Sequence, residues 1–266
     1  FCYAETIAPY LFGPDLQTYL IENYKPSTTL GYDNARDVLY GQVDLQPENR
    51  LECIYTGFTI TLDTNLDPST DAYSKGIDCE HSFPQSMGAG SEPQKSDMHH
   101  LYPCKSNVNS SRGNHPYGEI PDEDTDRWYK DDVTLYSIPT EDIDWYSEKE
   151  NDGIDRFEVR EMRKGDVARS IFYFFCMYQP VADVDFWEYQ KETLLVWNSY
   201  DLPDQNEIDR TWRIAGFQQN KPNPFVLDPT LADRILGEFL LPPENLTIVI
   251  SSDMASLSWL PVAGAS

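Results

Sequence analysis

The sequence contains few basic residues for its length. Of 266 residues, 20 are Lys or Arg and 45 are Asp or Glu, so the formal net charge is −25. Proteins that bind nucleic acid ordinarily present a basic face to the phosphates, so this balance by itself counts against that function. A solvated acidic surface explains most of the excess charge. Any phosphate-binding function therefore requires the few basic groups to be concentrated locally.

Long apolar runs, zinc motifs and repeats are also absent. No stretch approaches the length of a membrane-spanning apolar helix, so we expect no membrane span. The absence of a Cys-x-x-Cys pair disfavours zinc ribbons and thioredoxin-like redox sites. The absence of His-Glu-x-x-His disfavours a zinc hydrolase of that type. No internal repeat of useful period is found, which disfavours a solenoid.

Five cysteines occur, at Cys2, Cys53, Cys79, Cys104 and Cys176. The opening residues resemble the end of a signal peptide, which favours a secreted or periplasmic protein with disulfides. Setting Cys2 aside leaves an even number, for which three pairings are possible. We favour Cys79–Cys104, because these two flank a histidine-rich segment, with Cys53–Cys176 as the remaining pair. The alternative is that all four are buried free thiols.

Hydrophobic periodicity predicts an α+β domain that is mostly helical. A β-branched and aromatic stretch over residues 52–62 predicts a strand, and residues 63–74 a loop. A helix from about 156 to 179 becomes continuously apolar in its second half, which must be buried. Further helices are predicted at residues 16–24, 32–39, 185–220 and 229–240.

The chain changes character near its C-terminal end. Pro242 and Pro243 indicate a linker, and alternating residues 246–250 and 257–263 predict two strands. The pattern is similar to the first strands of a fibronectin type III module, although too short for the whole sandwich. We therefore expect one domain over residues 1–241, in which 1–4 are a signal-peptide remnant, and a truncated module over 242–266.

All four histidines of the chain fall between residues 81 and 115. The sequence predicts a strand over 77–83, a second strand over 98–102 that Pro103 ends, and a short helix over 105–112 that Gly113 ends. This order presents Glu80, His81 and Asn109 toward one small volume. The polar residues around the histidines are Glu80, Asp97, Asn107, Asn109, Arg112 and Asn114.

These residue types suit phosphodiester hydrolysis. An imidazole is neutral and basic near pH 7, so His81 is the expected general base. Glu80 and Asn109 offer hard oxygen ligands, which favour Mg²⁺, with Mn²⁺ or Ca²⁺ able to substitute. Neighbouring strand residues point to opposite sides, so Glu80 and His81 can lie on the two sides of a phosphate. We expect Asp97, His99, His100 and Asn114 to support the site, and His115 to be an ordinary core or surface residue.

Three motifs in order resemble the bacterial endonuclease I family. They read Glu80-His81-x-x-Pro84-Gln85-Ser86, Ser96-Asp97-Met98-His99-His100-Leu101-x-Pro103 and Val108-Asn109-Ser-x-Arg112-Gly113-Asn114-x-Pro116-Tyr117-Gly118. Weaker matches extend the resemblance over roughly residues 16–240. Members of this family are periplasmic or secreted nucleases with a ββα-metal (His-Me finger) site.

The resemblance implies a function and an assignment of roles. His81 falls on the family's general base, and Glu80 and Asn109 fall on its metal ligands. The implied reaction is sequence-nonspecific cleavage of DNA or RNA that leaves 5′-phosphates. Some members carry a phosphate-binding arginine in a longer loop after the Glu-His pair. The loop here, residues 85–95, contains no arginine, so Lys95, Arg112 or Arg169 is the substitute that we expect.

Two interpretations remain open beside this prediction. The densest basic cluster, residues 156–169, either binds phosphate or forms a salt-bridged helix face, because acidic residues are interleaved with it. The chain is either an active nuclease, for which we expect a monomer, or a non-catalytic secreted binding module on a nuclease fold. Intact Glu80, His81 and Asn109 favour the active enzyme.

Overall fold

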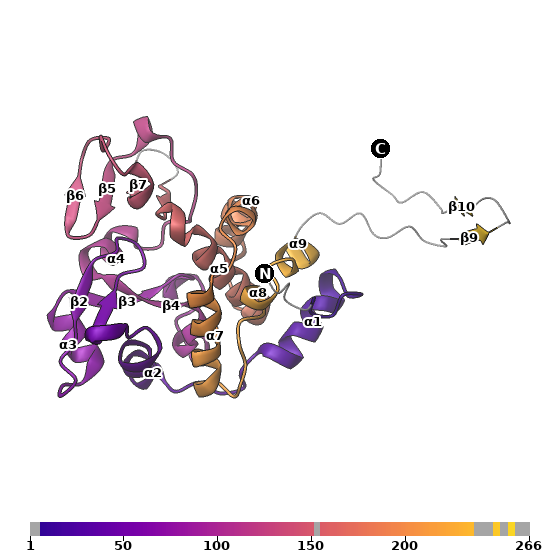
Figure 1. Cartoon of the computed structure of the whole chain (residues 1–266), viewed down its shortest axis with the longest axis horizontal. Coiled ribbons are helices and arrows are strands. Elements are labelled where there is room, and N and C mark those ends of the chain that lie inside the picture. The colour runs from indigo at the N-terminus through magenta and orange to yellow at the C-terminus, as the bar shows by residue number, and fades with distance from the viewer. Residues whose placement is uncertain (1–5, 152–154, 237–246, 251–254, 259–266) are drawn as a thin grey trace.

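Helices and small antiparallel sheets make up the chain, as the computed structural model shows. The structure describes residues 6–151, 155–236, 247–250 and 255–258. The predicted α+β fold class is confirmed. The part that carries the candidate site lies on one side of a helical layer in Figure 1.

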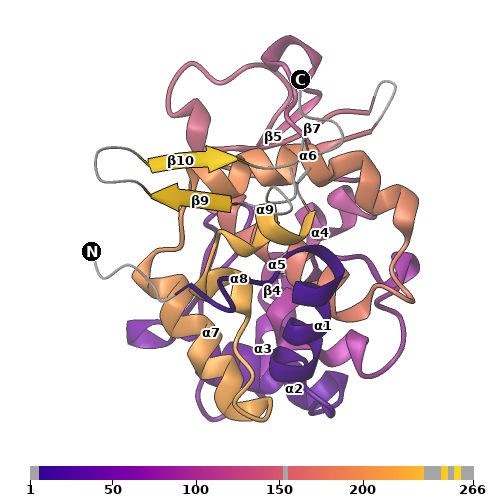
Figure 2. The same cartoon turned by 90° about the vertical axis from the view of Figure 1, so that its right-hand side faces the viewer.

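The helical layer is built around α5 (Lys164–Tyr178), every residue of which is buried. It packs against α1 (Gly13–Tyr24), α6 (Val184–Tyr200) and α8 (Pro224–Leu227), while α7 (Gln205–Phe217) and α9 (Leu231–Leu236) pack against these neighbouring helices. Figure 2 shows α1, α8 and α9 on the face turned toward the viewer. In the described part of the chain, no helix combines the length and apolarity that crossing a bilayer requires.

The predicted helix over 156–179 begins later than expected, at Lys164. Phe157 and Glu158 instead form β8, which pairs with β7 (Ser147–Lys149). Phe157 is fully buried, so strand pairing places an apolar side chain in the core and satisfies the backbone at the same time. The region predicted as helical over 185–220 divides into α6 and α7, and Asp204 caps the second helix by accepting from Glu207 N.

The N-terminal region contains α2 (Tyr32–Val38), which a π-helical turn over Leu39–Val43 extends beyond Gly41. The stretch predicted as one strand is a hairpin of β1 (Arg50–Glu52) and β2 (Thr59–Thr61), with Leu51 opposite Ile60. Gly57, at φ +76°, makes the turn between the strands possible. The predicted loop that follows contains a short helix, α3 (Pro68–Ser74).

The central motif is β3 (Ile77–His81), β4 (Leu101–Lys105) and α4 (Ser106–Arg112). The second strand begins later than predicted and runs through Pro103, while Met98–His100 is a 3₁₀ turn. Asp97 stabilises that turn by accepting from His99 N. Within its two-stranded sheet β4 pairs only with β3, so the missing N–H of Pro103 costs little.

A four-stranded antiparallel sheet lies on the other side of α4. Its order is β6 (Val133–Leu135), β5 (Arg127–Lys130), β7 and β8, and Figure 1 shows β5 to β7 above α4. Near the C-terminal end, β9 (Thr247–Ile250) and β10 (Ala255–Ser258) form an antiparallel pair. The predicted linker at Pro242–Pro243 lies outside the described residues, and the fibronectin-like module stays a prediction.

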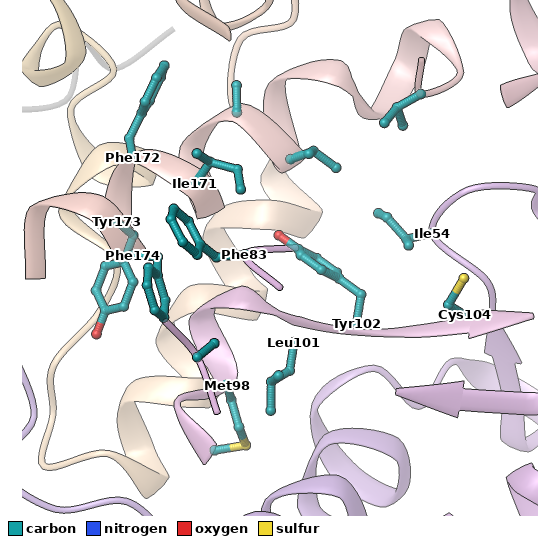
Figure 3. Close-up of a cluster of buried hydrophobic side chains, with 14 of the residues drawn as sticks. Ile54, Phe83, Met98, Leu101, Tyr102, Cys104, Ile171, Phe172, Tyr173 and Phe174 are labelled. Atoms are coloured by element: carbon teal, nitrogen blue, oxygen red, sulfur yellow. The ribbon is translucent and has the colours of Figure 1, made fainter. Parts of the chain in front are cut away.

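Aromatic packing joins the central motif to α5, as Figure 3 shows. Phe83, which follows β3, stacks on Phe174 of α5 with ring centroids 4.2 Å apart. Leu101 and Tyr102 of β4 are buried in the same core. An aromatic pair of this kind contributes about 0.5–1.5 kcal/mol beyond its buried area. The strands of the central motif are therefore held against a helix whose residues are all buried.

The predicted disulfides are wrong. Cys53, Cys79, Cys104 and Cys176 are buried free thiols. In the hairpin Cys79 is opposite Pro103, not Cys104, so the side chains of Cys79 and Cys104 project from opposite faces of the sheet. The sulfur of Cys104 instead lies 3.9 Å from that of Cys53, a packing contact rather than a covalent bond.

Candidate active site

The hairpin of β3 and β4 and the helix α4 bring Glu80, His81 and Asn109 together. Because Glu80 and His81 are neighbours on β3, their side chains leave opposite faces of the hairpin. His81 lies against Tyr32 of α2, with ring centroids 5.4 Å apart. Glu80 faces Tyr55 and Arg112. The strand therefore directs the Glu80 carboxylate and the His81 imidazole to opposite sides, as the sequence predicts.

One nitrogen of His81 has a fixed role. Nε2 lies 3.0 Å from the carbonyl oxygen of Lys95, which can only accept a hydrogen bond, so Nε2 carries the proton. In the neutral ring Nδ1 then holds the lone pair, and Gln85 Nε2 approaches it at 3.4 Å. Burial, followed by the neighbouring His100, lowers the pKa of His81 to about 3. The imidazole is therefore neutral at neutral pH, with its lone pair on Nδ1.

The amide of Asn109 is oriented by two acceptors. Its Nδ2 donates to Asp78 Oδ1 at 2.5 Å and to the carbonyl oxygen of Cys79 at 3.2 Å. Both partners accept only, so the NH₂ group must face them and the amide oxygen must face away. No hydrogen bond to that oxygen occurs among the residues that the structure describes. Sequence reasoning missed Asp78, although its place two residues before Glu80 puts it on the same face of β3.

Glu80 is 1% exposed, and both hydrogen bonds to its carboxylate go to the same oxygen. Its Oε1 accepts from Tyr55 OH at 2.8 Å and from Arg112 NH1 at 2.9 Å. Within the described part of the chain nothing donates to Oε2. Burial raises the pKa of the Glu80 carboxyl to about 7, and the Arg112 guanidinium opposes that shift. The carboxylate is thus fixed in place with one oxygen unused.

The oxygens left without partners fit a small hard cation. Glu80 Oε2 and the Asn109 amide oxygen are the donor types that Mg²⁺ prefers, and Mg²⁺ needs only one or two protein ligands because it retains water. The described residues hold no group of three His, Cys, Asp or Glu side chains arranged for a metal. A cage of three or four such side chains, as structural zinc sites have, is therefore not found in the part of the chain that the structure describes.

Two arginines that were predicted to contact substrate, Arg112 and Arg169, are buried inside the protein. Arg112 is fully buried and donates to Glu80 and to the carbonyl oxygens of His81 and Ser82. Arg169 is fully buried in α5, where it forms a two-point ion pair with Glu207 of α7. Both predictions of a direct phosphate contact are corrected, because each guanidinium is occupied inside the protein.

The remaining residues named from the sequence differ in burial and in their contacts. Lys95 is half-buried beside His81. Asp97 is buried and accepts from the hydroxyls of Tyr173 and Tyr178. The rings of His99 and His100 bond to the backbone oxygens of Lys221 and Gln94. Asn114 is exposed just after α4, and His115 contacts the carbonyl oxygen of Asp155.

The basic cluster of residues 156–169 is a set of ion pairs. Its five cations are Arg156, Arg160, Arg163, Lys164 and Arg169, and each has a carboxylate partner. Several partners come from distant segments, as Glu52 does for Arg160 and Glu207 for Arg169. Of the two interpretations left open, the structure favours the salt-bridged one. The cluster supports the fold rather than a phosphate.

A pocket of about 440 Å³ lies apart from these groups. Among its lining residues are Asp44, Arg163, Arg210 and Arg213. It contains none of the predicted catalytic or metal-binding side chains. The residues of the candidate site, Glu80, His81 and Asn109, therefore do not line this pocket.

Comparison with known proteins agrees with the motifs. Residues 13–230 match the family described as Endonuclease I. The chain is 30% identical over 241 residues to an extracellular ribonuclease of Bacillus subtilis (strain 168), covering 84% of this chain and 74% of the relative. It is 31% identical over 152 residues to an extracellular ribonuclease of Bacillus amyloliquefaciens, covering 52% of this chain and 46% of the relative. The chain therefore belongs to the endonuclease I family of nucleic-acid hydrolases.

Proposed function

We propose that this protein is a secreted, Mg²⁺-dependent endonuclease that hydrolyses phosphodiester bonds of RNA or DNA without sequence specificity. The observation that carries the proposal is the juxtaposition of an oriented, neutral His81 with two unused oxygens, on Glu80 and Asn109. A base beside a hard-oxygen cation site is what phosphodiester hydrolysis needs.

His81 acts as the general base. Its Nδ1 accepts a proton from the attacking water, while Nε2 keeps its hydrogen bond to the carbonyl oxygen of Lys95. That bond orients the ring and stabilises the imidazolium that forms. Gln85 Nε2 lies 3.4 Å from Nδ1, on the lone-pair side of the ring. The expected products carry 5′-phosphates, since the leaving group is then the 3′-oxygen.

Glu80 and Asn109 would hold the cation through Glu80 Oε2 and the Asn109 amide oxygen. When bound, Mg²⁺ supplies positive charge that stabilises the phosphate and the leaving oxygen. Arg112 and Tyr55 fix Glu80, and Asp78 fixes Asn109. These contacts keep both ligands in place before substrate arrives.

The proposed substrate and the proposed location of the enzyme are supported by the names of its relatives. Both Bacillus proteins are named extracellular ribonucleases, which favours RNA as a substrate and secretion as the location. The site has no group that distinguishes ribose from deoxyribose among its assigned residues, so DNA is an expected second substrate. We expect the enzyme to act as a monomer.

The decisive experiment compares His81→Ala with His115→Ala, a histidine outside the hairpin. Both variants and the wild type are incubated with RNA and with plasmid DNA in Mg²⁺ or EDTA. Loss of a positioned base should lower kcat by about 10²–10⁴-fold in His81→Ala, whereas His115→Ala should match the wild type. EDTA should abolish cleavage, and mass spectrometry should find 5′-phosphates.

Retained cleavage by His81→Ala would reject the assigned base. A folded wild type that binds nucleic acid but cleaves neither substrate with any divalent cation would instead favour the non-catalytic binding module.

A further inference from the structure

The pocket of about 440 Å³ has many charged lining residues, and the proposed cleavage uses none of them. Its volume falls within the range of about 300–1,000 Å³ that small-molecule sites have. The apolar part of its lining includes Ile54 and Tyr102, which are labelled in Figure 3. The charged side chains that line it are Asp44, Glu52, Arg163, Asp166, Glu207, Arg210 and Arg213.

The carboxylates of the pocket are almost fully engaged within the protein. In three of the four, both oxygens accept hydrogen bonds. These carboxylates and their donors are Asp44 with Arg210, Glu207 with Arg169, and Glu52 with Arg160 and Gln46. The fourth, Asp166, accepts from Arg163 NH1 at 3.3 Å. The acidic groups therefore offer a ligand few free acceptors.

The arginines of the pocket, in contrast, retain unused donors. Arg213 donates through NH1 to the carbonyl oxygen of Val43, and no carboxylate of the described residues lies within 4.0 Å of it. Arg163 makes the one hydrogen bond to Asp166, and its NH2 lies at a longer 3.7 Å from Glu52. Arg210 uses Nε and NH2, and in the described part of the chain nothing accepts from its NH1.

The three arginines lie around one space. Arg210 and Arg213 are three residues apart on α7, so they share a face of the helix, and both bond to the segment 43–44. The Arg210 guanidinium lies 4.3 Å from the centroid of the Tyr102 ring. The Tyr102 hydroxyl in turn donates to the backbone of the first turn of α5, which Arg163 directly precedes.

The local charge of the pocket is opposite to that of the chain. Five guanidinium groups line it or pair with its carboxylates, against four carboxylates, so this set carries a charge of +1 in a chain of net charge −25. The five are Arg160, Arg163, Arg169, Arg210 and Arg213. Free donors and positive charge together favour an anionic ligand.

We propose that this pocket binds a small phosphate ligand, either a free phosphate ion or a 5′-mononucleotide, through Arg163, Arg210 and Arg213. A guanidinium matches the oxygens of a phosphate with paired N–H donors. The remaining volume has room for an organic group such as a nucleoside. The pocket does not include Glu80, His81 or Asn109, so its occupation does not depend on the proposed catalytic function.

The experiment is calorimetric titration of the full-length protein at low salt with adenosine 5′-monophosphate, inorganic phosphate or adenosine. EDTA is present, so that no divalent cation recruits phosphate to the hairpin. Arg163→Gln and Arg213→Gln each remove one guanidinium. Arg127→Gln is the matched control, because Arg127 also forms no ion pair among the described residues but contacts Ser111 of α4.

A second variant adds a negative charge without removing a contact of the arginines. Asn206 is exposed, lines the pocket and lies in the first turn of α7. An acidic residue is favourable at that end of a helix, so Asn206→Asp should fold normally and still repel a phosphate. Asn206→Gln is its neutral control.

The nucleotide and phosphate should bind, whereas adenosine should not. Arg163→Gln and Arg213→Gln should each weaken binding about tenfold, as loss of a hydrogen bond to a charged group does. Asn206→Asp should weaken it about fivefold, and both controls should match the wild type. Tighter binding of the nucleotide than of phosphate would identify a mononucleotide as the ligand, and equal affinities would identify free phosphate.

The inference is overturned if the folded wild type binds neither anion, or if the two arginine variants and Asn206→Asp bind as tightly as their controls. Arg213→Gln should cleave RNA at the wild-type rate. A wild type that does not cleave RNA would therefore reject the catalytic proposal and leave the result of the titration unaffected.

Discussion

At the scale of the residue, orientation of single polar groups defines the site. Asp78 and the carbonyl oxygen of Cys79 hold both hydrogens of the Asn109 amide. The amide oxygen is thereby directed away from Asp78 and from the carbonyl oxygen of Cys79. A ligand that is oriented before binding loses less entropy when a cation arrives, and groups that orient metal ligands influence affinity strongly.

Asp78→Ala should weaken the cation site without removing a ligand. The Asn109 amide then loses one of its two acceptors and samples other orientations. We expect the Mg²⁺ concentration for half-maximal cleavage to rise by about 10- to 100-fold, with kcat recovered at saturating Mg²⁺. Titration of activity with Mg²⁺ measures this. Asn107→Ala, an exposed residue on the same helix, serves as control, and an unchanged Mg²⁺ requirement in Asp78→Ala would refute the orienting role.

At the scale of the element, buried ion pairs join the helices behind the site. Arg169 of α5 and Glu207 of α7 pair through two hydrogen bonds of 2.8 and 2.6 Å. Arg169 also donates to the carbonyl oxygen of Asp201, between α6 and α7. One guanidinium thus links α5 to α7 and to the segment between α6 and α7. Its contribution is therefore expected in stability and not in substrate affinity.

Arg169→Met should destabilise the fold and leave the chemistry intact. Removing one partner leaves Glu207 as an uncompensated buried charge, which costs about 3–5 kcal/mol. The double variant Arg169→Met, Glu207→Met should recover much of that loss. Urea unfolding measures the free energy, and KM is measured on the folded enzyme at low temperature. A stable Arg169→Met protein with a raised KM would show instead that this arginine binds substrate.

At the scale of the whole molecule, some of the many acidic side chains are buried in the interior. Glu148 of β7 lies opposite Glu158 of β8, and both are buried. The cation nearby, Lys164, pairs with Glu158 and also with Glu119 and Glu161. Like charges opposite each other on a sheet destabilise it. Burial raises the pKa of Glu148 to about 8, with Glu158 adding to the shift and the hydrogen bond from Thr125 opposing it.

This raised pKa predicts how stability depends on pH. The folded-state pKa of Glu148 lies above its unfolded value, so its contribution is complete below the unfolded pKa and is lost as pH rises through about 8. Thermal and urea unfolding should therefore show lower stability at pH 9 than at pH 6. Glu148→Gln should remove about 1–2 kcal/mol of that difference, after allowance for solvent screening.

The control for the pH experiment is Glu192→Gln on α6, whose side chain is 82% exposed. It should leave the pH profile as in the wild type. If Glu148→Gln keeps the full loss of stability between pH 6 and 9, the carboxyl of Glu148 does not titrate in that range.

The sequence by itself determined the family and the fold class, and it gave the residues of the candidate site, whose roles stay predictions. Motifs around Glu80, His81 and Asn109 are local in the chain, and the strand–strand–helix order follows from neighbouring residue types. Gly113 ends α4 at φ +57°, as a glycine at a helix end predicts. Such features depend on short segments, so they are visible before any tertiary contact is known.

Only the tertiary structure decided which charges are free and which cysteines are near each other. Arg169 and Lys95 are both cations beside motif residues in the sequence, yet Arg169 meets Glu207 while Lys95 meets no carboxylate among the described residues. Cys104 lies beside Cys53 and not Cys79, because the hairpin register sets the face of each residue. Ion pairing and burial depend on segments distant in the chain, and the distance between them is set by the fold.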